Sequence, residues 1–196
     1  MSASVLTGQK EPSGASRQVW QFAGGYPDRV RLAVGDVVVY ATHGVGRIVA
    51  REKRVIDGAD QEIVVLALAG GLTVTLPLMR AYSLLRPPVD EADLSRVQQT
   101  LRGDEPLSSD VWLKRRNVMQ AKLKGGDPIE LAEVVRDGAR RGRATAAGPS
   151  KSQLSPGERD LYVRARRLLS EEIHVVRGGE EADADAWIEA QLGPTS

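Results

Sequence analysis

The chain contains no cysteine, and this absence limits its chemistry at once. Without thiols it can form no disulfide, no thiolate metal site and no cysteine nucleophile. Only two histidines occur, His43 and His174, and they lie far apart in the sequence. Walker, GxSxG, HExxH and EF-hand patterns are missing as well. The sequence therefore argues against an enzyme and against a metal or other cofactor.

Long apolar runs are also missing. No stretch approaches the roughly 20 apolar residues that a membrane-spanning helix needs, and the first residues lack the apolar segment of a signal peptide. We therefore expect a cytoplasmic protein without membrane contact. Aromatic residues make up only 4% of the chain whereas hydrophobic residues make up 41%, so the core must be mainly aliphatic.

The stretch from Leu32 to Pro77 contains short β-branched runs separated by glycines. Asp57-Gly58 divides two of these runs and is a strong hairpin signal, and Gly70-Gly71 marks the next turn. Four or five strands within about fifty residues favour a closed sheet, because closure removes exposed strand edges. The sequence predicts a small SH3-like or Tudor-like antiparallel β-barrel.

Helical spacing of apolar residues replaces this pattern after Arg86-Pro87-Pro88. From Asp90 onward Leu94, Val97 and Leu101 recur at helical spacing. Capping signals precede three further expected helices: Ser108 or Ser109, then Asp127-Pro128, then Ser155-Pro156. The predicted fold class is α+β, a barrel followed by an all-α domain. The expected parts are a disordered tail (1–31), the barrel domain (32–88), a helical domain (89–178, with a flexible loop at 142–153), and a short C-terminal helix and tail (179–196).

Charge is nearly balanced over the whole chain but unevenly distributed along it. The 27 Lys and Arg residues against 26 Asp and Glu give a net charge of +1, which argues against a uniformly basic nucleic-acid binder. Residues 111–126 nevertheless contain only basic charges: Lys114, Arg115, Arg116, Lys122 and Lys124. The charge is therefore segregated, and the middle of the chain is its basic part.

Several motifs, taken in order, resemble those of the CarD family. They are Val34-Gly35-Asp36-Val37-Val38-Val39-Tyr40, His43-Gly44-Val45-Gly46, Leu72-Thr73-Val74-Thr75-Leu76-Pro77, Asp110-Val111-Trp112-Leu113-Lys114-Arg115-Arg116, Leu131–Asp137 and Leu154–Arg159. The first three resemble the RNA polymerase-interacting module that CarD proteins share with transcription-repair coupling factors. The resemblance covers the chain from about Leu32 to Val176 and implies a role in transcription.

For the barrel, the resemblance implies docking on the β subunit of RNA polymerase, largely through strand pairing. The docking strand corresponds to Leu72, Thr73, Val74 and Thr75, and Arg54 matches a family arginine just before the hairpin turn. An ordinary exposed strand residue is an equally good interpretation of Arg54. Thr75 departs from the pattern, because some relatives have an arginine there, and the departure removes one possible ion pair.

Trp112 has two opposite interpretations. On a helical wheel it lies near Met119 and Leu123, which predicts a core tryptophan. Its place in the first helical turn, with Arg115 and Arg116 at i+3 and i+4, instead favours a ring that overhangs the helix end beside positive charge. The resemblance supports the second interpretation, since CarD proteins use a tryptophan here at the upstream edge of the transcription bubble. The predicted DNA-contact residues are Trp112, Lys114, Arg115, Arg116 and Arg159.

The sequence thus predicts a two-part, monomeric transcription factor that binds the polymerase β subunit and promoter DNA. DNA contact is expected through the minor groove and backbone, with little sequence specificity, and is expected to stabilise the open complex. One alternative is an RNA- or ribosome-associated barrel with a basic helical tail. Another is an enzyme whose site has no recognised motif.

Overall fold

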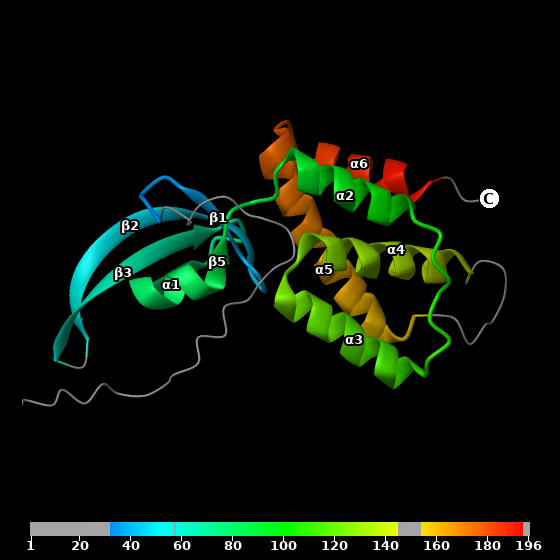
Figure 1. Cartoon of the computed structure of the whole chain (residues 1–196), viewed down its shortest axis with the longest axis horizontal. Coiled ribbons are helices and arrows are strands. Elements are labelled where there is room, and N and C mark those ends of the chain that lie inside the picture. Colours follow the sequence, from blue (N-terminus) through cyan, green and yellow to red (C-terminus); the bar gives the residue numbers. More distant parts are fainter. Residues whose placement is uncertain (1–31, 57, 145–153, 194–196) are drawn as a thin grey trace, which may run out of the picture.

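The fold is described from a computed structural model that covers residues 32–56, 58–144 and 154–193 (Figure 1). The tail predicted for residues 1–31 lies outside this range, as do residues 145–153 of the predicted loop. The loop prediction is wrong for residues 142–144, which end a helix. The described chain has a sheet with one short helix at one end and five further helices at the other.

The N-terminal half forms one antiparallel sheet in the order β4-β3-β2-β1-β5. The strands are β1 Val37–Tyr40, β2 Gly44–Ile56, β3 Ala59–Leu68, β4 Thr73–Pro77 and β5 Leu85–Arg86. β2 and β3 form the predicted hairpin, with Ile56 opposite Ala59 and Gly58 at a φ of 78°. Gly71 has the same φ, and the Leu68 N–H donates to the Leu72 carbonyl at 2.9 Å, which confirms the second turn.

The predicted closure of this sheet into a barrel is wrong. After Pro77 the chain enters helix α1 (Leu78–Leu84) instead of another long strand. The next strand, β5, has two residues and pairs with β1, and within the described residues nothing joins it to β4. Helix α1 packs on β3, β4 and β5 and buries Ala81, so it covers the sheet face that closure would have enclosed.

The helical part begins after Asp90, where the apolar spacing predicts its first helix. Its helices are α2 Glu91–Arg102, α3 Trp112–Gly125, α4 Pro128–Ala144, α5 Pro156–Arg177 and α6 Glu181–Leu192. The Asp90 carboxylate accepts from the Asp93 N–H at 2.8 Å, and that of Asp127 accepts from the Ile129 N–H at 2.8 Å. Ser155 and Glu158 form a complete capping box at the start of α5. These three predicted helix starts are confirmed.

Helix α3 begins differently. Val111 occupies the N-cap position without a side-chain hydrogen bond, and the Ser108 hydroxyl donates to Asp110 instead. The expected serine cap is therefore wrong, and the helix starts at Trp112 itself.

Two separate apolar clusters hold the fold. The sheet cluster includes Leu32, Val38, Ile48, Val64, Leu66, Leu76 and Leu85. The helical cluster gathers residues of all five C-terminal helices, among them Val97, Leu123, Leu131, Leu169 and Ile188. Helix α6 contributes the fully buried Ile188, so it packs into the same core as α2–α5. No helix in the described ranges is long and apolar enough to cross a membrane.

Candidate nucleic-acid interface and edge strand

Trp112 is exposed at the tip of α3. Its relative exposure is 53%, and its neighbours Val111 and Leu113 are exposed to 70% and 50%. Leu123, from the same side of the helical wheel, is 4% exposed and Met119 packs on the helical core. The core prediction from periodicity is wrong because the first turn of α3 extends beyond the residues that bury its later turns.

Arg115, one turn along, is nearly buried and bound to α5. Its guanidinium donates two hydrogen bonds to the Glu158 carboxylate, at 2.8 and 3.1 Å, and a third to the Asp110 carbonyl at 2.7 Å. The side chains of Arg115 and Glu158 are 10% and 0% exposed. A bidentate pair of this kind fixes both position and angle, so Arg115 fastens the start of α3 to the start of α5.

Glu158 stays charged in this pair although it is buried. Burial acts to raise its pKa, but the hydrogen bonds from Arg115 and from Ser155 act in the opposite direction and prevail. The net effect is a pKa below the ordinary value of Glu158. The same carboxylate accepts from the Ser155 N–H at 2.8 Å, so one side chain completes the α5 cap and holds Arg115.

Lys114 is exposed but already has a carboxylate partner. Its ammonium lies 2.9 Å from the Asp110 carboxylate, and its side chain is 66% exposed. Hydrogen bonds from Lys114 and from Ser108 lower the pKa of Asp110. An exposed pair of this type is weak, so Lys114 can exchange Asp110 for another anion.

Arg116 and Arg159 are exposed, and neither pairs with a carboxylate of the described residues. Arg116 follows Trp112 by one turn and lies against the start of α5. A Cβ atom added to Gly157 would lie 3.2 Å from the Arg116 Nε. Trp112, Arg116, Ser155, Pro156 and Gly157 line an open hollow of about 480 Å³. One unpaired guanidinium group, that of Arg116, therefore shares the junction of α3 and α5 with the exposed ring of Trp112, and Arg159 is a second exposed arginine in the first turn of α5.

The predicted docking strand lies at an edge of the sheet. β4 pairs with β3 on one side, and no described strand pairs with its other side. Leu72, Thr73 and Thr75 are exposed, whereas Val74 packs partly on the sheet core. An edge with free backbone donors and acceptors can accept a further strand from another protein.

Arg54 lies beyond the end of this strand. Pro77, the last residue of β4, lies opposite Ile63 of β3, which in turn lies opposite Glu52 of β2. Arg54 follows Glu52 by two residues and lies opposite Gln61. Its guanidinium contacts the Glu52 carboxylate at 3.0 Å, and both side chains are exposed. A partner that pairs with β4 would have to continue past Pro77 to reach Arg54.

Two family models match the chain. The CarD-like/TRCF RID domain matches residues 32–89, and the CarD C-terminal domain matches residues 96–189. The chain belongs to the CarD family. In this CarD-family chain the edge strand β4 falls within the first matched region, and Trp112 with its cations falls within the second.

A Bacillus subtilis (strain 168) protein named "Putative transcription factor YdeB" is 29% identical over 147 residues, which cover 74% of this chain and 92% of that protein. CarD-family membership gives the chain its general role, regulation of transcription through interaction with RNA polymerase. The family is one of transcription factors.

Glu158 is the residue of this site that the sequence analysis missed. The Ser-Pro-Gly-Glu sequence identifies it as a capping residue, and the structure confirms that function. Its pairing with Arg115, 43 positions away, depends on how α3 crosses α5. A local pattern carries no information on that crossing.

Proposed function

We propose that this CarD-family protein docks on the β subunit of RNA polymerase through β4 and contacts promoter DNA through Trp112 at the upstream edge of the transcription bubble. The exposed Trp112 ring, with the unpaired Arg116 lining the same hollow, is the observation that carries the proposal. The protein acts as a monomer in the cytoplasm, with residues 32–88 as the polymerase-binding part and residues 89–178 as the DNA-binding part.

Docking uses addition of a strand to the free edge of β4. Backbone hydrogen bonds supply most of the affinity in this mode, and side chains that alternate along the strand supply specificity. Leu72, Thr73 and Thr75 face outward for such contacts. Arg54 forms an outlying ion pair with the polymerase by exchanging Glu52 for a carboxylate of the partner.

DNA contact combines a wedge with phosphate-binding cations. A ring inserted at a base step of the minor groove stabilises a kinked duplex, and cations that bind phosphates hold the protein in place. Trp112 supplies the ring, Arg116 and Arg159 supply free guanidinium groups, and Lys114 joins them by leaving Asp110. Arg115 acts behind this surface, because its hydrogen bonds to Glu158 keep α3 and α5 at a fixed angle.

The protein then stabilises the open complex by differential binding. A ligand shifts an equilibrium only as far as it prefers one state over the other. A wedge fits distorted DNA at the bubble edge better than closed duplex. A preference of about 1.4 kcal/mol would shift the equilibrium about tenfold toward the open complex.

The proposal is tested by co-purification of the tagged protein before and after nuclease treatment. Polymerase subunits should remain bound after nuclease, because docking uses protein contacts. Loss of polymerase with the nucleic acid, or recovery of ribosomal proteins instead, would favour the RNA-associated alternative. Open-complex lifetime on a promoter template, with and without the protein, tests the second half of the proposal.

A further inference from the structure

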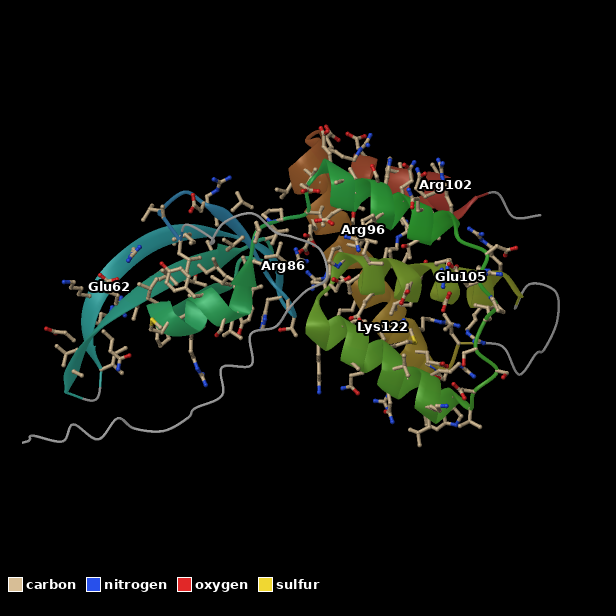
Figure 2. The ribbon with its side chains drawn as sticks, viewed as in Figure 1. Glu62, Arg86, Arg96, Arg102, Glu105 and Lys122 are labelled. Atoms are coloured by element: carbon tan, nitrogen blue, oxygen red, sulfur yellow. The ribbon has the colours of Figure 1, made fainter. Side chains whose placement is uncertain are left out.

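Two adjacent glutamates of α5 connect the helical part to the sheet. Glu171 and Glu172 are 8% and 1% exposed, yet neither belongs to the apolar clusters. The Glu172 carboxylate accepts two hydrogen bonds from the Arg86 guanidinium and a third from the Val89 N–H at 2.9 Å. Arg86 also donates to the Gly126 carbonyl at 2.8 Å. Figure 2 shows Arg86 where the sheet meets the helices. The Arg86 guanidinium thus joins β5, the end of α3 and the later part of α5.

Glu171 makes the second connection, at the turn between β1 and β2. Its carboxylate accepts from the Val45 N–H at 3.3 Å, and Arg164 of α5 donates to the Thr42 carbonyl at 2.8 Å. Gly44 has a φ of 91°, and a Cβ there would overlap the Glu171 carboxylate. The His-Gly-Val-Gly sequence at 43–46 therefore does more than form a turn, since its first glycine admits α5.

A second glycine permits a similarly close approach to the same turn, from the end of α3. Gly126, the C-cap residue of α3, has a φ of 66°. A Cβ atom added to Gly126 would lie only 2.5 Å from the Ala41 Cβ. The helices thus hold the sheet at two neighbouring places, the 41–45 turn and Arg86, which adjoin because Leu85 pairs with Tyr40. Two attachments restrict rotation between the two parts, whereas one attachment would leave a pivot.

Buried ion pairs of this kind specify geometry more than they add stability. Removing two charges from water costs about as much as their attraction returns, but a buried carboxylate tolerates only arrangements in which its donors are present. The two prolines after Arg86 further restrict the connecting backbone. The contacts therefore select one orientation of the sheet relative to the helices.

We infer that Glu172 with Arg86, and Glu171 with Val45, are positioning residues that hold the free edge of β4 and the Trp112 ring at one fixed separation and angle. The inference rests on the proposed function, since it concerns how the two proposed contacts act together. A rigid connection raises the effective concentration of the second contact once the first has formed, provided that the geometry matches. Docking on polymerase then delivers the ring to one place on the DNA.

The orientation is measured by spin-label distances, for which this chain is well suited. It has no cysteine, so labels attach only at introduced ones. Val55 on β2 and Val163 on α5 are 71% and 58% exposed, so Val55→Cys and Val163→Cys place one label on each part. The double-labelled protein should give one narrow distance distribution, and Glu172→Gln should broaden it. The amide nitrogen of glutamine presents a donor where Arg86 and Val89 already donate.

Two further variants accompany Glu172→Gln. Arg86→Lys retains the charge but lacks the planar group that reaches Glu172 and Gly126 together, so it should also broaden the distribution. It keeps the test decisive if Glu172→Gln fails to fold. Glu189→Gln is the matched control, because it removes an exposed ion pair with Arg166 inside the helical part and should leave the distribution narrow.

The same variants are then compared on polymerase and promoter DNA. Glu172→Gln and Arg86→Lys should bind polymerase alone and DNA alone as wild type does, yet the open-complex lifetime should fall to that of polymerase without the protein. A residue with a merely structural role would change the separate binding steps as well. A narrow distribution in both variants, or a broadened distribution with wild-type lifetime, would overturn the inference. A narrow wild-type distribution with no effect of wild type on lifetime would instead overturn the proposed function.

Discussion

Within one turn of α3, Trp112 faces solvent whereas Arg115 is nearly buried, and this difference decides what each substitution should do. Removal of an exposed ring takes little away from the free protein. Removal of one member of a buried ion pair leaves the other charge without a partner in the interior. Substitutions of two residues one turn apart should therefore change different quantities: DNA contact for Trp112 and stability for Arg115.

Trp112→Ala should leave the melting temperature and polymerase binding close to wild type but shorten the open-complex lifetime. Truncation of a core tryptophan would cost about 3–5 kcal/mol, whereas a surface change away from special features stays within about 0.5 kcal/mol. If the ring contributes as base stacking does, about 1–3 kcal/mol, the lifetime should fall about fivefold or more. Leu113→Ala, at an equally exposed neighbour, is the control and should change neither quantity. An unchanged lifetime for Trp112→Ala would remove the wedge from the mechanism.

At the scale of elements, the junction of α3 and α5 depends on the charge of Glu158. Because its pKa in the folded protein is lower than its ordinary 4.5, the charged form stabilises the fold fully above that value. This stabilisation is lost as pH falls through the lower folded pKa. Glu158→Gln should therefore melt well below wild type at neutral pH, by an amount that reflects about 3–5 kcal/mol for a broken buried pair.

The difference in melting temperature between wild type and Glu158→Gln should shrink as the pH falls below 4.5. Thermal melts across this range measure it directly. Glu189→Gln removes a carboxylate that is 53% exposed and leaves Asp185 to pair with Arg166, so this variant should melt close to wild type at every pH. A difference that stays constant with pH would show that the charge of Glu158 is not what holds the junction.

The edge strand allows a gain-of-function test. Some relatives have an arginine where this chain has Thr75, so Thr75→Arg should strengthen polymerase binding. The gain should be a few-fold and should disappear at high salt, because an exposed ion pair contributes about 0–1 kcal/mol. Thr73→Arg, two positions away on the same face of β4, is the control for a general effect of positive charge. Equal gains from both variants would argue against a specific ion pair at residue 75.

The sequence predicted the starts of three helices correctly, but it did not predict how the helices and strands pack together. Asp127 and Ser155 each predicted a helix start correctly, because a cap acts on residues two or three positions away, and apolar spacing predicted the start after Asp90. Barrel closure could not be predicted in this way, since it depends on the path of the chain after Pro77. The exposure of Trp112 likewise depends on the residues opposite the first turn of α3, which periodicity within the helix does not encode.

At the scale of the whole molecule, two apolar clusters divide the chain into parts that should fold separately. All residues of the sheet cluster lie between Leu32 and Leu85, and none of them belongs to the helical cluster. A fragment that ends at Pro88 should therefore fold and bind polymerase without binding DNA. Circular dichroism and polymerase binding measure the two properties. An unfolded fragment, or a folded one without affinity for polymerase, would contradict the division.

DNA binding by the full chain should be weak, nearly indifferent to sequence and dependent on salt. The logarithm of affinity falls against the logarithm of salt concentration with a slope of about −0.9 for each phosphate neutralised. With Arg115 bound to Glu158, three predicted contacts remain, from Lys114, Arg116 and Arg159. The slope should then be about −2 to −3. Arg116→Gln should reduce its magnitude by about 0.9 and lower affinity uniformly across sequences.

Lys53→Gln, on the sheet far from Trp112, is the matched control and should leave the slope unchanged. Arg115→Gln distinguishes the buried Arg115 from the exposed Arg116. This variant should lower the melting temperature, because it breaks the buried ion pair with Glu158. At temperatures where this variant is still folded, its slope should remain that of wild type. A drop of about 0.9 for a folded Arg115→Gln would mean that Arg115 leaves Glu158 to bind a phosphate. The start of α3 would then rearrange on DNA instead of meeting it preformed.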